Sequence, residues 1–350
     1  MGKRVKSKKK KGMRIFVIAL VVLILVAGGL LGYKIFMGKD GQGVISLGED
    51  NGIKDEKKNI KIFNGKERPI AIMIDNHSGA WPQAGLNDTY AIYEIIVEGG
   101  ETRMMALFKG KDTDKIGPVR SSRHYFLDYA MENDAIYTHY GWSPQAESDI
   151  GTYRINNING ISESEKDFWR IKDKAAPHNV LTSIKNIKKI AEKKKYRMTS
   201  SEESVLNYSA DEINLNSEQV ANKITIPYSE LHTTAYTYDA NTQRYIRYAR
   251  GKQQTDYSTK EPITTKNIII TFAQNYELKD SEHKDRQGIN NVGTLDGYYI
   301  TNGKAEKIKC EKTARDKKTI YKDLNGNVIQ VNDGNTIFNI CPSDSKVTFE

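Results

Sequence analysis

Short apolar runs alternate with amphipathic or mixed segments along the first half of the chain. Pro69 to Ile74 (PIAIMI) is a near-continuous apolar run that suits a strand buried on both faces. Arg103 to Phe108 (RMMALF) and Ala135 to His139 (AIYTH) are predicted as further strands. Tyr90 to Val97 is also broadly apolar and follows Asn87-Asp88-Thr89. We therefore predict a buried helix over Tyr90 to Val97, ended by Gly99-Gly100.

Helical patterns separate these runs. Ser121 or Ser122 can cap a helix that continues to about Met131, and Ser143 can begin another short helix. Ser183 to Lys195 has helical spacing, and its apolar face consists of Ile184, Ile187, Ile190 and Ala191. Alternating strands and helices predict a layered α/β domain, to which we assign residues 68–207.

The composition changes after about Asn207. From Lys223 onward the chain is rich in Thr, Tyr, Ile and Val. Turn sequences recur at short spacing, namely Asp239-Ala240-Asn241, Asn302-Gly303, Asn325-Gly326 and Asp333-Gly334. Such turns between apolar runs are typical of hairpins, so residues 208–350 are predicted to form a mainly β domain. The predicted fold class is α+β.

An uncharged segment from Ile15 to Tyr33 precedes both domains. As a helix it would be about 28 Å long, close to the thickness of a bilayer core. We predict a basic cytoplasmic tail over residues 1–14, a transmembrane anchor over 15–37 and a polar linker over 38–67. The basic flank places the N-terminus in the cytoplasm and the bulk of the chain outside the cell membrane. A cleaved signal peptide is the alternative, with Ala27-Gly28-Gly29 as its cleavage site.

The charge balance argues against nucleic acid as a partner. The net charge is +9, from 53 basic and 44 acidic residues. Nine of the basic residues lie before Ile35, whereas the first acidic residue is Asp40, so 44 basic residues face 44 acidic ones from Ile35 onward. The excess therefore belongs to the membrane-flanking tail, and the remainder lacks the basic character of nucleic-acid-binding domains.

Polar side chains follow or precede several of the predicted strands and helices. Strand ends and helix starts can converge on one edge of a layered α/β fold, where ligand crevices form. We expect backbone NH groups after Val119 to assist Arg120 and Arg123 in holding an anion, and arginine suits a carboxylate or phosphate bound through two hydrogen bonds. The predicted ligand-binding residues are Asp75, Asn76, His77, Arg103, Arg120, Ser121, Arg123, His139 and Gln145.

Two alternatives remain open for these residues. The same acids and arginines can pair with one another as a buried structural network. An envelope hydrolase would use Asp75, Glu98 or His139 as acid or base. His77, His139 and His178 lie in no metal-binding motif, so neither a metal nor a cofactor is predicted. The partners we expect are the membrane and either an anionic envelope polymer or an envelope protein.

Cys310 and Cys341 are the two cysteines of the chain. An extracytoplasmic location permits a disulfide between them. Both also lie in apolar strand patterns, which suits two separate buried thiols. The sequence leaves these alternatives open.

Five motifs occur in a characteristic order, namely RPIAIMIDNHSGAWPQAGL, YEIIVEGGETRMMALF, KIGPVRSSRHYF, YTHYGWSPQA and APHNVLTS. Together with the C-terminal segment TNGKAEKIKCEKTARDKKTIYKDLNGNVIQVNDGNTIFNI, they resemble the YerB family of bacterial envelope lipoproteins over about residues 68–343. The resemblance implies two domains outside the cytoplasm and implies no particular activity. Members of that family usually carry a lipid-modified cysteine near the N-terminus, where this chain has the apolar segment instead.

Overall fold

The structure, a computed structural model, describes residues 60–279 and 284–350. The predicted tail, the predicted anchor and most of the predicted linker lie outside these residues. Within the described ranges, none of the helices combines the length and the apolar character needed to cross a membrane.

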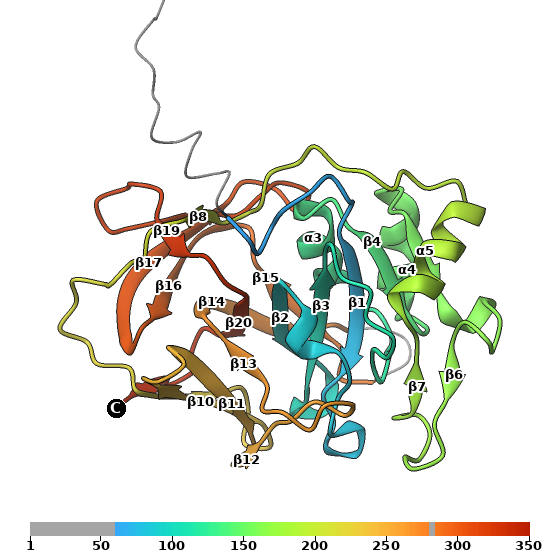
Figure 1. Cartoon of the computed structure of the whole chain (residues 1–350), viewed down its shortest axis with the longest axis horizontal. Helices are drawn as coiled ribbons and strands as arrows, with labels where there is room; N and C mark the ends of the chain where they lie inside the picture. Colours follow the sequence, from blue (N-terminus) through green and yellow to red (C-terminus); the bar gives the residue numbers. More distant parts are fainter. Residues whose placement is uncertain (1–59, 280–283) are drawn as a thin grey trace, which may run out of the picture. The chain divides into compact units, whose positions relative to one another are not determined.

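A large mixed sheet of eleven strands forms the centre of the described chain (Figure 1). Its first-half strands are β1 (Ile70–Asp75), β2 (Ala91–Ile96), β3 (Thr102–Phe108), β4 (Ile136–His139) and β5 (Asn157–Asn159). Its second-half strands are β14 (Asn267–Glu277), β15 (Gln287–Asn290), β16 (Gly293–Thr301), β17 (Lys304–Lys312), β18 (Ile320–Lys322) and β20 (Thr336–Pro342). The strand order is β18-β17-β16-β14-β20-β2-β3-β1-β4-β5, and β15 pairs with β14. The sheet thus combines strands from both predicted domains, through β20.

The predicted strands at residues 69–74, 103–108 and 135–139 are confirmed as β1, β3 and β4. The predicted helix over Tyr90 to Val97 is wrong, because this segment is β2. All six residues of β2 are buried, and the strand is paired antiparallel with β3 and parallel with β20. A continuous apolar run suits a helix or a strand covered on both faces equally well, and here the two neighbouring strands decide the outcome.

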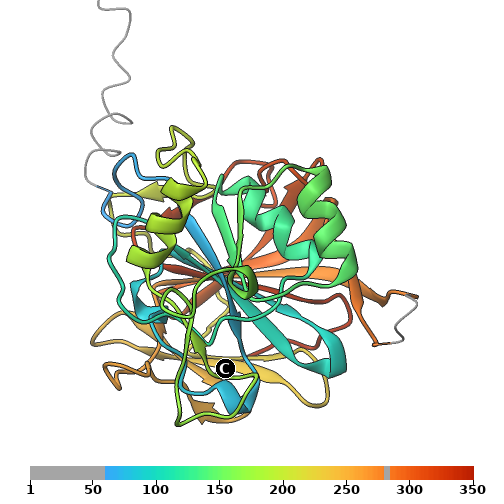
Figure 2. The same ribbon diagram turned by 90° about the vertical axis from the view of Figure 1, so that its right-hand side faces the viewer.

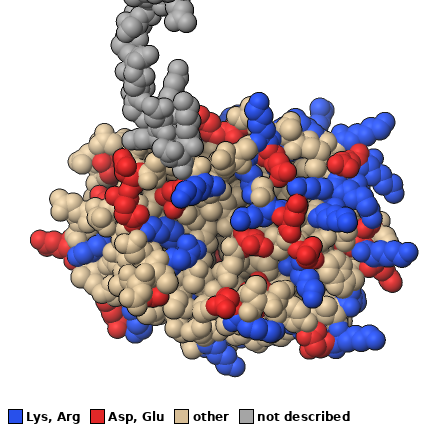
Figure 3. Space-filling model, viewed as in Figure 1, with Lys and Arg blue, Asp and Glu red and all other residues tan. Residues whose placement is uncertain are grey.

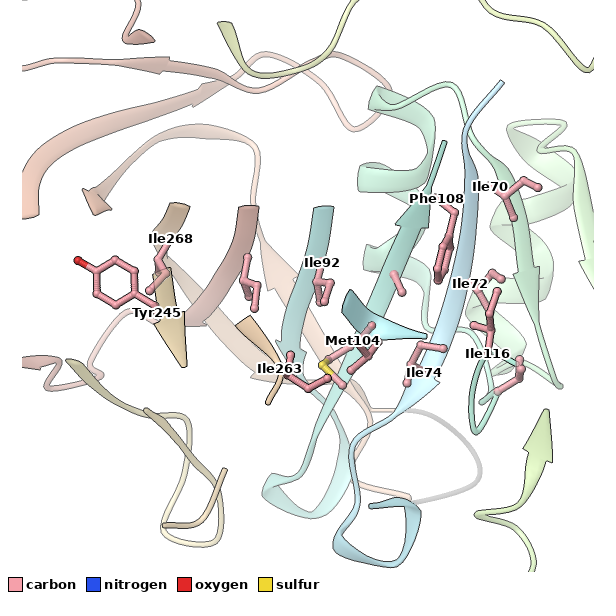
Figure 4. Packing of buried hydrophobic residues seen from close by; sticks show 14 of the residues in the cluster. Ile70, Ile72, Ile74, Ile92, Met104, Phe108, Ile116, Tyr245, Ile263 and Ile268 are labelled. Carbon is pink, nitrogen blue, oxygen red and sulfur yellow. The ribbon is translucent and has the colours of Figure 1, made fainter. Parts of the chain in front are cut away.

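Three α-helices cover the large sheet, namely α3 (His124–Glu132), α4 (Pro144–Thr152) and α5 (Ile184–Lys193). Alternate residues of β1 belong to two different cores. Ile70, Ile72 and Ile74 pack in the core that includes α5, whereas Ala71 and Met73 pack in the core that includes α3 and α4. Figure 2 shows these helices on the two sides of the strands, and Figure 4 shows the first core around β1.

The two later helices agree with the sequence, but the first does not begin as predicted. Ser143 and Ser183 cap α4 and α5, and each side chain accepts a backbone hydrogen bond. The N-cap of α3 is Arg123, without a side-chain cap, so the prediction for Ser121 or Ser122 is wrong. The hydroxyl of Ser122 is buried and accepts from Tyr137 instead, because the segment before α3 is held between strands.

A second, six-stranded sheet packs on the same face as α5. Its strands are β9 (Lys223–Pro227), β10 (Thr233–Asp239), β11 (Arg244–Ala249), β12 (Lys252–Gln253), β13 (Thr264–Thr265) and β21 (Thr348–Phe349). Two short pairs complete the strands: β6 (Trp169–Arg170) with β7 (Val180–Leu181), and β8 (Asn207–Ser209) with β19 (Gln330–Asn332). The mainly β character predicted for the second region is confirmed. Asn302 and Gly303 form the β16–β17 turn with φ of 48° and 75°, the left-handed conformation that this sequence favours.

Both cysteines are free and buried, which matches the alternative of two separate thiols. Cys310 accepts a hydrogen bond from the Thr271 hydroxyl at 3.4 Å, and Cys341 Sγ lies 3.7 Å from the Thr271 carbonyl oxygen. Burial raises the pKa of each thiol to about 12. Both are therefore protonated and unreactive at neutral pH.

Charged side chains of both signs are interspersed over the face shown in Figure 3, with Lys and Arg denser on the side where α5 lies. Several lysines of α5 are paired. Lys188 lies 3.2 Å from both Glu67 and Asp112, and Lys189 contacts Asp167. The carboxylates of Glu67 and Asp112 are exposed and that of Asp167 is buried, so pairing with acidic residues of the same protein balances part of the positive charge of this helix.

Candidate functional site

One edge of the large sheet carries most of the predicted site residues. β1 runs parallel to β4 and antiparallel to β3, so the end of β1 and the start of β3 lie together, and Asp75 is the register partner of Arg103. A cleft of about 440 Å³ opens at this edge. It is lined by Asp75, His77, Val97, Glu98, Glu101, Thr102, Arg103, Arg120, Arg123, Trp142, His178, Lys284 and Arg286.

The segment KIGPVRSSRHYF passes between β1 and β4 at this edge. Val119 forms a bridge with Ile74, the NH of Arg120 donates to the Met73 carbonyl at 2.9 Å, and the Arg120 carbonyl accepts from the Tyr140 NH at 3.0 Å. The NH of Ser122 donates to the Gly141 carbonyl. These amides are therefore used within the sheet. The expectation that NH groups after Val119 address an anion is wrong for Arg120 and Ser122.

Asp75 is almost fully buried and has three polar neighbours. Its Oδ1 accepts from the backbone NH of His77 at 3.0 Å. Its Oδ2 lies 2.7 Å from His178 Nδ1 and 3.2 Å from Arg120 Nε. Asp75 therefore holds a histidine and an arginine at the same carboxylate oxygen.

The turn between β2 and β3 brings a second carboxylate to the cleft. Gly99 and Gly100 have φ of 66° and 70°, a conformation that glycine adopts without strain. This tight turn places Glu98 against Arg123, whose Nε contacts Oε1 and whose Nη2 donates to Oε2 at 3.0 Å. Glu98 Oε2 also lies 3.8 Å from Arg103 Nη2. Arg123 is thus held in the two-point geometry that distinguishes arginine from lysine.

The arginines crowd one another in the cleft. Burial, followed by the charge of nearby Arg123, lowers the pKa of Arg103 to about 10. Burial raises the pKa of Glu98, but the hydrogen bond and charge of Arg123 and the charge of Arg103 outweigh it, and the net pKa lies below the usual range. The lining carries five cationic groups and three carboxylates. Three of these cationic groups are the guanidiniums of Arg103, Arg120 and Arg123, a group suited to carboxylates and phosphates.

Arg120 differs from its two neighbours. Arg103 and Arg123 each donate to a backbone carbonyl, of Ser121 and Ser122 respectively. Apart from the contact of its Nε with Asp75, no hydrogen bond joins the guanidinium of Arg120 to residues 60–279 or 284–350. Its side chain is 26% exposed. Its two terminal nitrogens therefore remain available to a ligand.

Four predicted residues do not line the cleft. Asn76 is fully buried beneath it and donates to Glu94 and Thr102. Ser121 contributes its carbonyl to Arg103, and its hydroxyl donates to the Tyr140 carbonyl. His139 is fully buried, and Gln145 is exposed and donates to Asp149 on α4.

His178 and Glu101 are cleft residues that were not among the predicted ligand-binding residues. His178 follows Ala176-Pro177 in a loop about one hundred residues beyond Asp75, and it was considered only as a metal ligand. His178 and Asn179 are two polar residues between Pro177 and the apolar pair Val180-Leu181, which was an available signal. Glu101 lies 3.9 Å from His77 Nε2 and contacts Arg250 of the loop after β11.

The acid and base candidates of the sequence all have internal partners. Asp75 holds Arg120 and His178, and Glu98 holds Arg123. His139 Nδ1 donates to the Gly141 carbonyl at 2.8 Å, and its Nε2 lies 3.3 Å from Asn157 Oδ1. Among the described residues, no group of three or more His, Cys, Asp or Glu side chains is arranged to hold a metal ion.

Comparison with known proteins identifies both halves of the chain. The model described as "Protein of unknown function (DUF3048) N-terminal domain" matches residues 57–197, and that of the DUF3048 C-terminal domain matches residues 224–337. "Putative lipoprotein YerB" of Bacillus subtilis (strain 168) is 29% identical over 286 residues, which is 81% of this chain and 80% of that protein.

The fold is also similar to a solved structure. The crystal structure of the YerB protein from Bacillus subtilis has a TM-score of 0.72 and 28% identity, over 81% of this chain and 94% of that one. The chain therefore carries both the N-terminal and the C-terminal domain of the DUF3048 family and is related to YerB of Bacillus subtilis.

Proposed function

We propose that the chain is a membrane-anchored, extracytoplasmic protein of the cell envelope, whose arginine-lined cleft binds an anionic ligand through a carboxylate or phosphate group. The binding proposal rests on the contacts of the Arg120 guanidinium. This guanidinium is fixed at Nε by Asp75, while its terminal nitrogens have no hydrogen-bond partner among the described residues. An anion that accepts from these nitrogens would complete the arrangement.

The envelope location is supported by two separate observations. The apolar segment Ile15 to Tyr33 is flanked by basic residues on its N-terminal side, as in anchors whose C-terminal part is exported. The related YerB protein is described as a putative lipoprotein. In this location the cleft could bind a ligand of the envelope, such as an anionic polymer or a partner protein with acidic groups.

The binding proposal is tested by Arg120→Lys. We expect this variant to bind inorganic phosphate and malonate at least tenfold more weakly than the wild type, because lysine keeps the charge and loses the planar pair of donors. Binding is measured by calorimetry on the full-length chain in detergent. The matched control is Arg197→Lys, because Arg197 pairs with Asp134 outside the cleft with a 52% exposed side chain.

A thermal melt separates this proposal from a purely structural role. If Arg120 lines a binding site, the melting temperature of Arg120→Lys stays near that of the wild type while binding falls. A large fall in melting temperature, or unchanged binding of both anions, would instead make Arg120 part of a structural network. Failure of the wild type to bind either anion would refute the proposal itself.

A further inference from the structure

Asp75 and His178 form a hydrogen-bonded pair in the wall of the cleft. The Oδ2···Nδ1 distance is 2.7 Å. An ionised carboxylate can only accept, so Nδ1 of His178 carries the hydrogen, and Nε2 of the neutral ring has a lone pair. No described residue forms a hydrogen bond with that Nε2. The pair therefore has the geometry of a general base with an orienting carboxylate.

The ring of His178 is held in this orientation from several sides. It stacks on His77, with the ring centroids 4.4 Å apart and the planes 12° from parallel. The backbone NH of His178 donates to the Ala175 carbonyl at 2.9 Å. At Gly79, an added Cβ would lie 3.1 Å from His178 Cδ2, so glycine allows the backbone to approach closely. A base that is fixed before substrate binds loses little conformational entropy in the reaction.

The base and the proposed anion site share one atom. Arg120 Nε and His178 Nδ1 both approach Asp75 Oδ2, at 3.2 Å and 2.7 Å. Asp75 therefore joins the guanidinium of Arg120 and the imidazole of His178 in one wall of the cleft. A phosphodiester combines an anionic group for Arg120 and an electrophilic phosphorus in one compact unit, so a single group of the substrate can address both residues.

We propose that His178, oriented by Asp75, is a general base for the hydrolysis of a phosphodiester held by Arg120. This inference rests on the proposed anion-binding function. The oxygen of a water molecule forms a bond to phosphorus while His178 Nε2 takes a proton from that water. The bond from phosphorus to one ester oxygen breaks on the opposite side, the departing alkoxide takes a proton from solvent water, and His178 returns its proton to solvent. The products are a phosphomonoester and an alcohol.

The other acid and base candidates suit this step less well. Glu98 is held at both oxygens by Arg123. His139 is fully buried and does not line the cleft. His178 combines a place in the cleft wall, a fixed ring and a ring nitrogen that no described residue engages.

The experiment measures hydrolysis of bis(4-nitrophenyl) phosphate by the full-length chain in detergent, together with calorimetric binding of inorganic phosphate. We expect the wild type to hydrolyse the diester, and His178→Gln to lower kcat about 100- to 10,000-fold while phosphate binding is retained. Asp75→Asn should also lower kcat, because an amide that donates to Nδ1 reverses the tautomer of the imidazole, and it should weaken phosphate binding as well, because Asp75 holds Arg120 at Nε. His124→Gln, which changes a histidine outside the cleft, should leave kcat unchanged.

The outcomes separate this inference from the proposed function. Phosphate binding without hydrolysis by the wild type would overturn the catalytic role and leave the binding site intact. Hydrolysis that survives in both His178→Gln and Asp75→Asn would also overturn it. If the wild type binds neither phosphate nor malonate, the proposed function and the inference fail together, whereas binding of malonate alone overturns only the inference. Should His178→Gln not fold, His178→Asn supplies the same test and leaves Asp75 and Arg120 in place.

Discussion

At the scale of single residues, the structure separates two histidines that the sequence presents alike. His139 ends β4 and is fully buried, with Nδ1 bonded to the Gly141 carbonyl. Burial lowers its pKa to about 4, so the ring is neutral at physiological pH. His178 lies in the cleft wall on Asp75. A position at the end of a strand thus predicted that a residue lies near the cleft, but it did not predict that the side chain is exposed to the cleft.

The depressed pKa of His139 predicts a loss of stability in mild acid. The unfolded chain takes up a proton at this ring near pH 6.5, whereas the folded chain does so near pH 4. Between these values the unfolded state binds more protons, so the stability contributed by neutral His139 is complete above pH 6.5 and falls as the pH drops toward 4. The expected loss is about 3 kcal/mol.

Urea unfolding of the wild type and His139→Gln at pH 7, 6, 5 and 4 checks this expectation. The glutamine variant should lose less unfolding free energy over this range than the wild type, whatever its stability at pH 7. His77→Gln is the control, because His77 has a 44% exposed side chain. Equal pH dependence in the wild type and His139→Gln would contradict the assignment.

The cleft was partly predictable from the sequence. Asp75, His77, Arg103, Arg120 and Arg123 were expected to converge because they lie at the ends of strands and near the start of a helix, and all five line the cleft. His178 was not predicted to join the site, because it reaches Asp75 from a loop, and the position of a loop depends on long-range packing that no local pattern encodes. Asn76 and Ser121 follow the same strand-end rule, but their polar groups are used within the protein.

At the scale of elements, β20 shows what a local pattern leaves open. It pairs in parallel with β14 on one side and with β2 on the other, and Figure 1 shows it between them. All seven of its residues are buried. The apolar sequence of β20 is sufficient to predict a strand. Its partner β2 lies more than two hundred residues earlier in the chain, and a local pattern does not predict such a pairing. The same pairing makes Tyr90 to Val97 a strand and not the predicted helix.

Phe338 of β20 should be important for the stability of this junction. Its ring stacks on Tyr93 of β2, with centroids 4.3 Å apart, and lies 5.8 Å from the ring of Tyr321. We expect Phe338→Ala to lower the free energy of unfolding by about 3–5 kcal/mol, because the cavity cannot close between paired strands. Urea unfolding measures this loss. The control is Phe349→Ala, at a partly exposed position in β21, which should lower the free energy of unfolding much less. Equal losses in the two variants would contradict a special role of Phe338 in the stability of the junction.

At the scale of the whole described chain, the two sheets are joined by a buried polar cluster around Glu94 of β2. Its Oε2 accepts from Arg247 Nη2 of β11 at 2.9 Å, and both side chains are fully buried. Its Oε1 accepts from Thr102 and Thr234, each at 2.8 Å. Burial raises the pKa of Glu94, but Arg247 and His232 outweigh it, and the net pKa falls well below the usual range. The carboxylate is therefore ionised.

This cluster also connects the second sheet to the cleft. Asn76, which directly follows Asp75, donates to Glu94 Oε1 at 3.0 Å. Glu101 in the cleft contacts Arg250, and its Oε2 lies 3.7 Å from His232 Nδ1. The sequence predicted a layered α/β region and a mainly β region, and both are present. It could not predict that a fully buried ion pair would join them, because Arg247 reads locally as an exposed position of an alternating strand.

Glu94 and Arg247 should consequently be strongly coupled. Glu94→Gln and Arg247→Met should each lower the free energy of unfolding by about 3–5 kcal/mol, because each leaves the other group buried without its partner. The double variant should be more stable than the sum of the two losses implies, since it removes both members of the pair. Urea unfolding of all four proteins gives the coupling free energy.

The matched control is the double-mutant cycle for Lys223 and Glu350. These residues lie 2.8 Å apart, with side chains 53% and 61% exposed. Their coupling free energy should stay below about 1 kcal/mol. Additive losses at Glu94 and Arg247 would mean that the two sheets are held together by their apolar contacts alone.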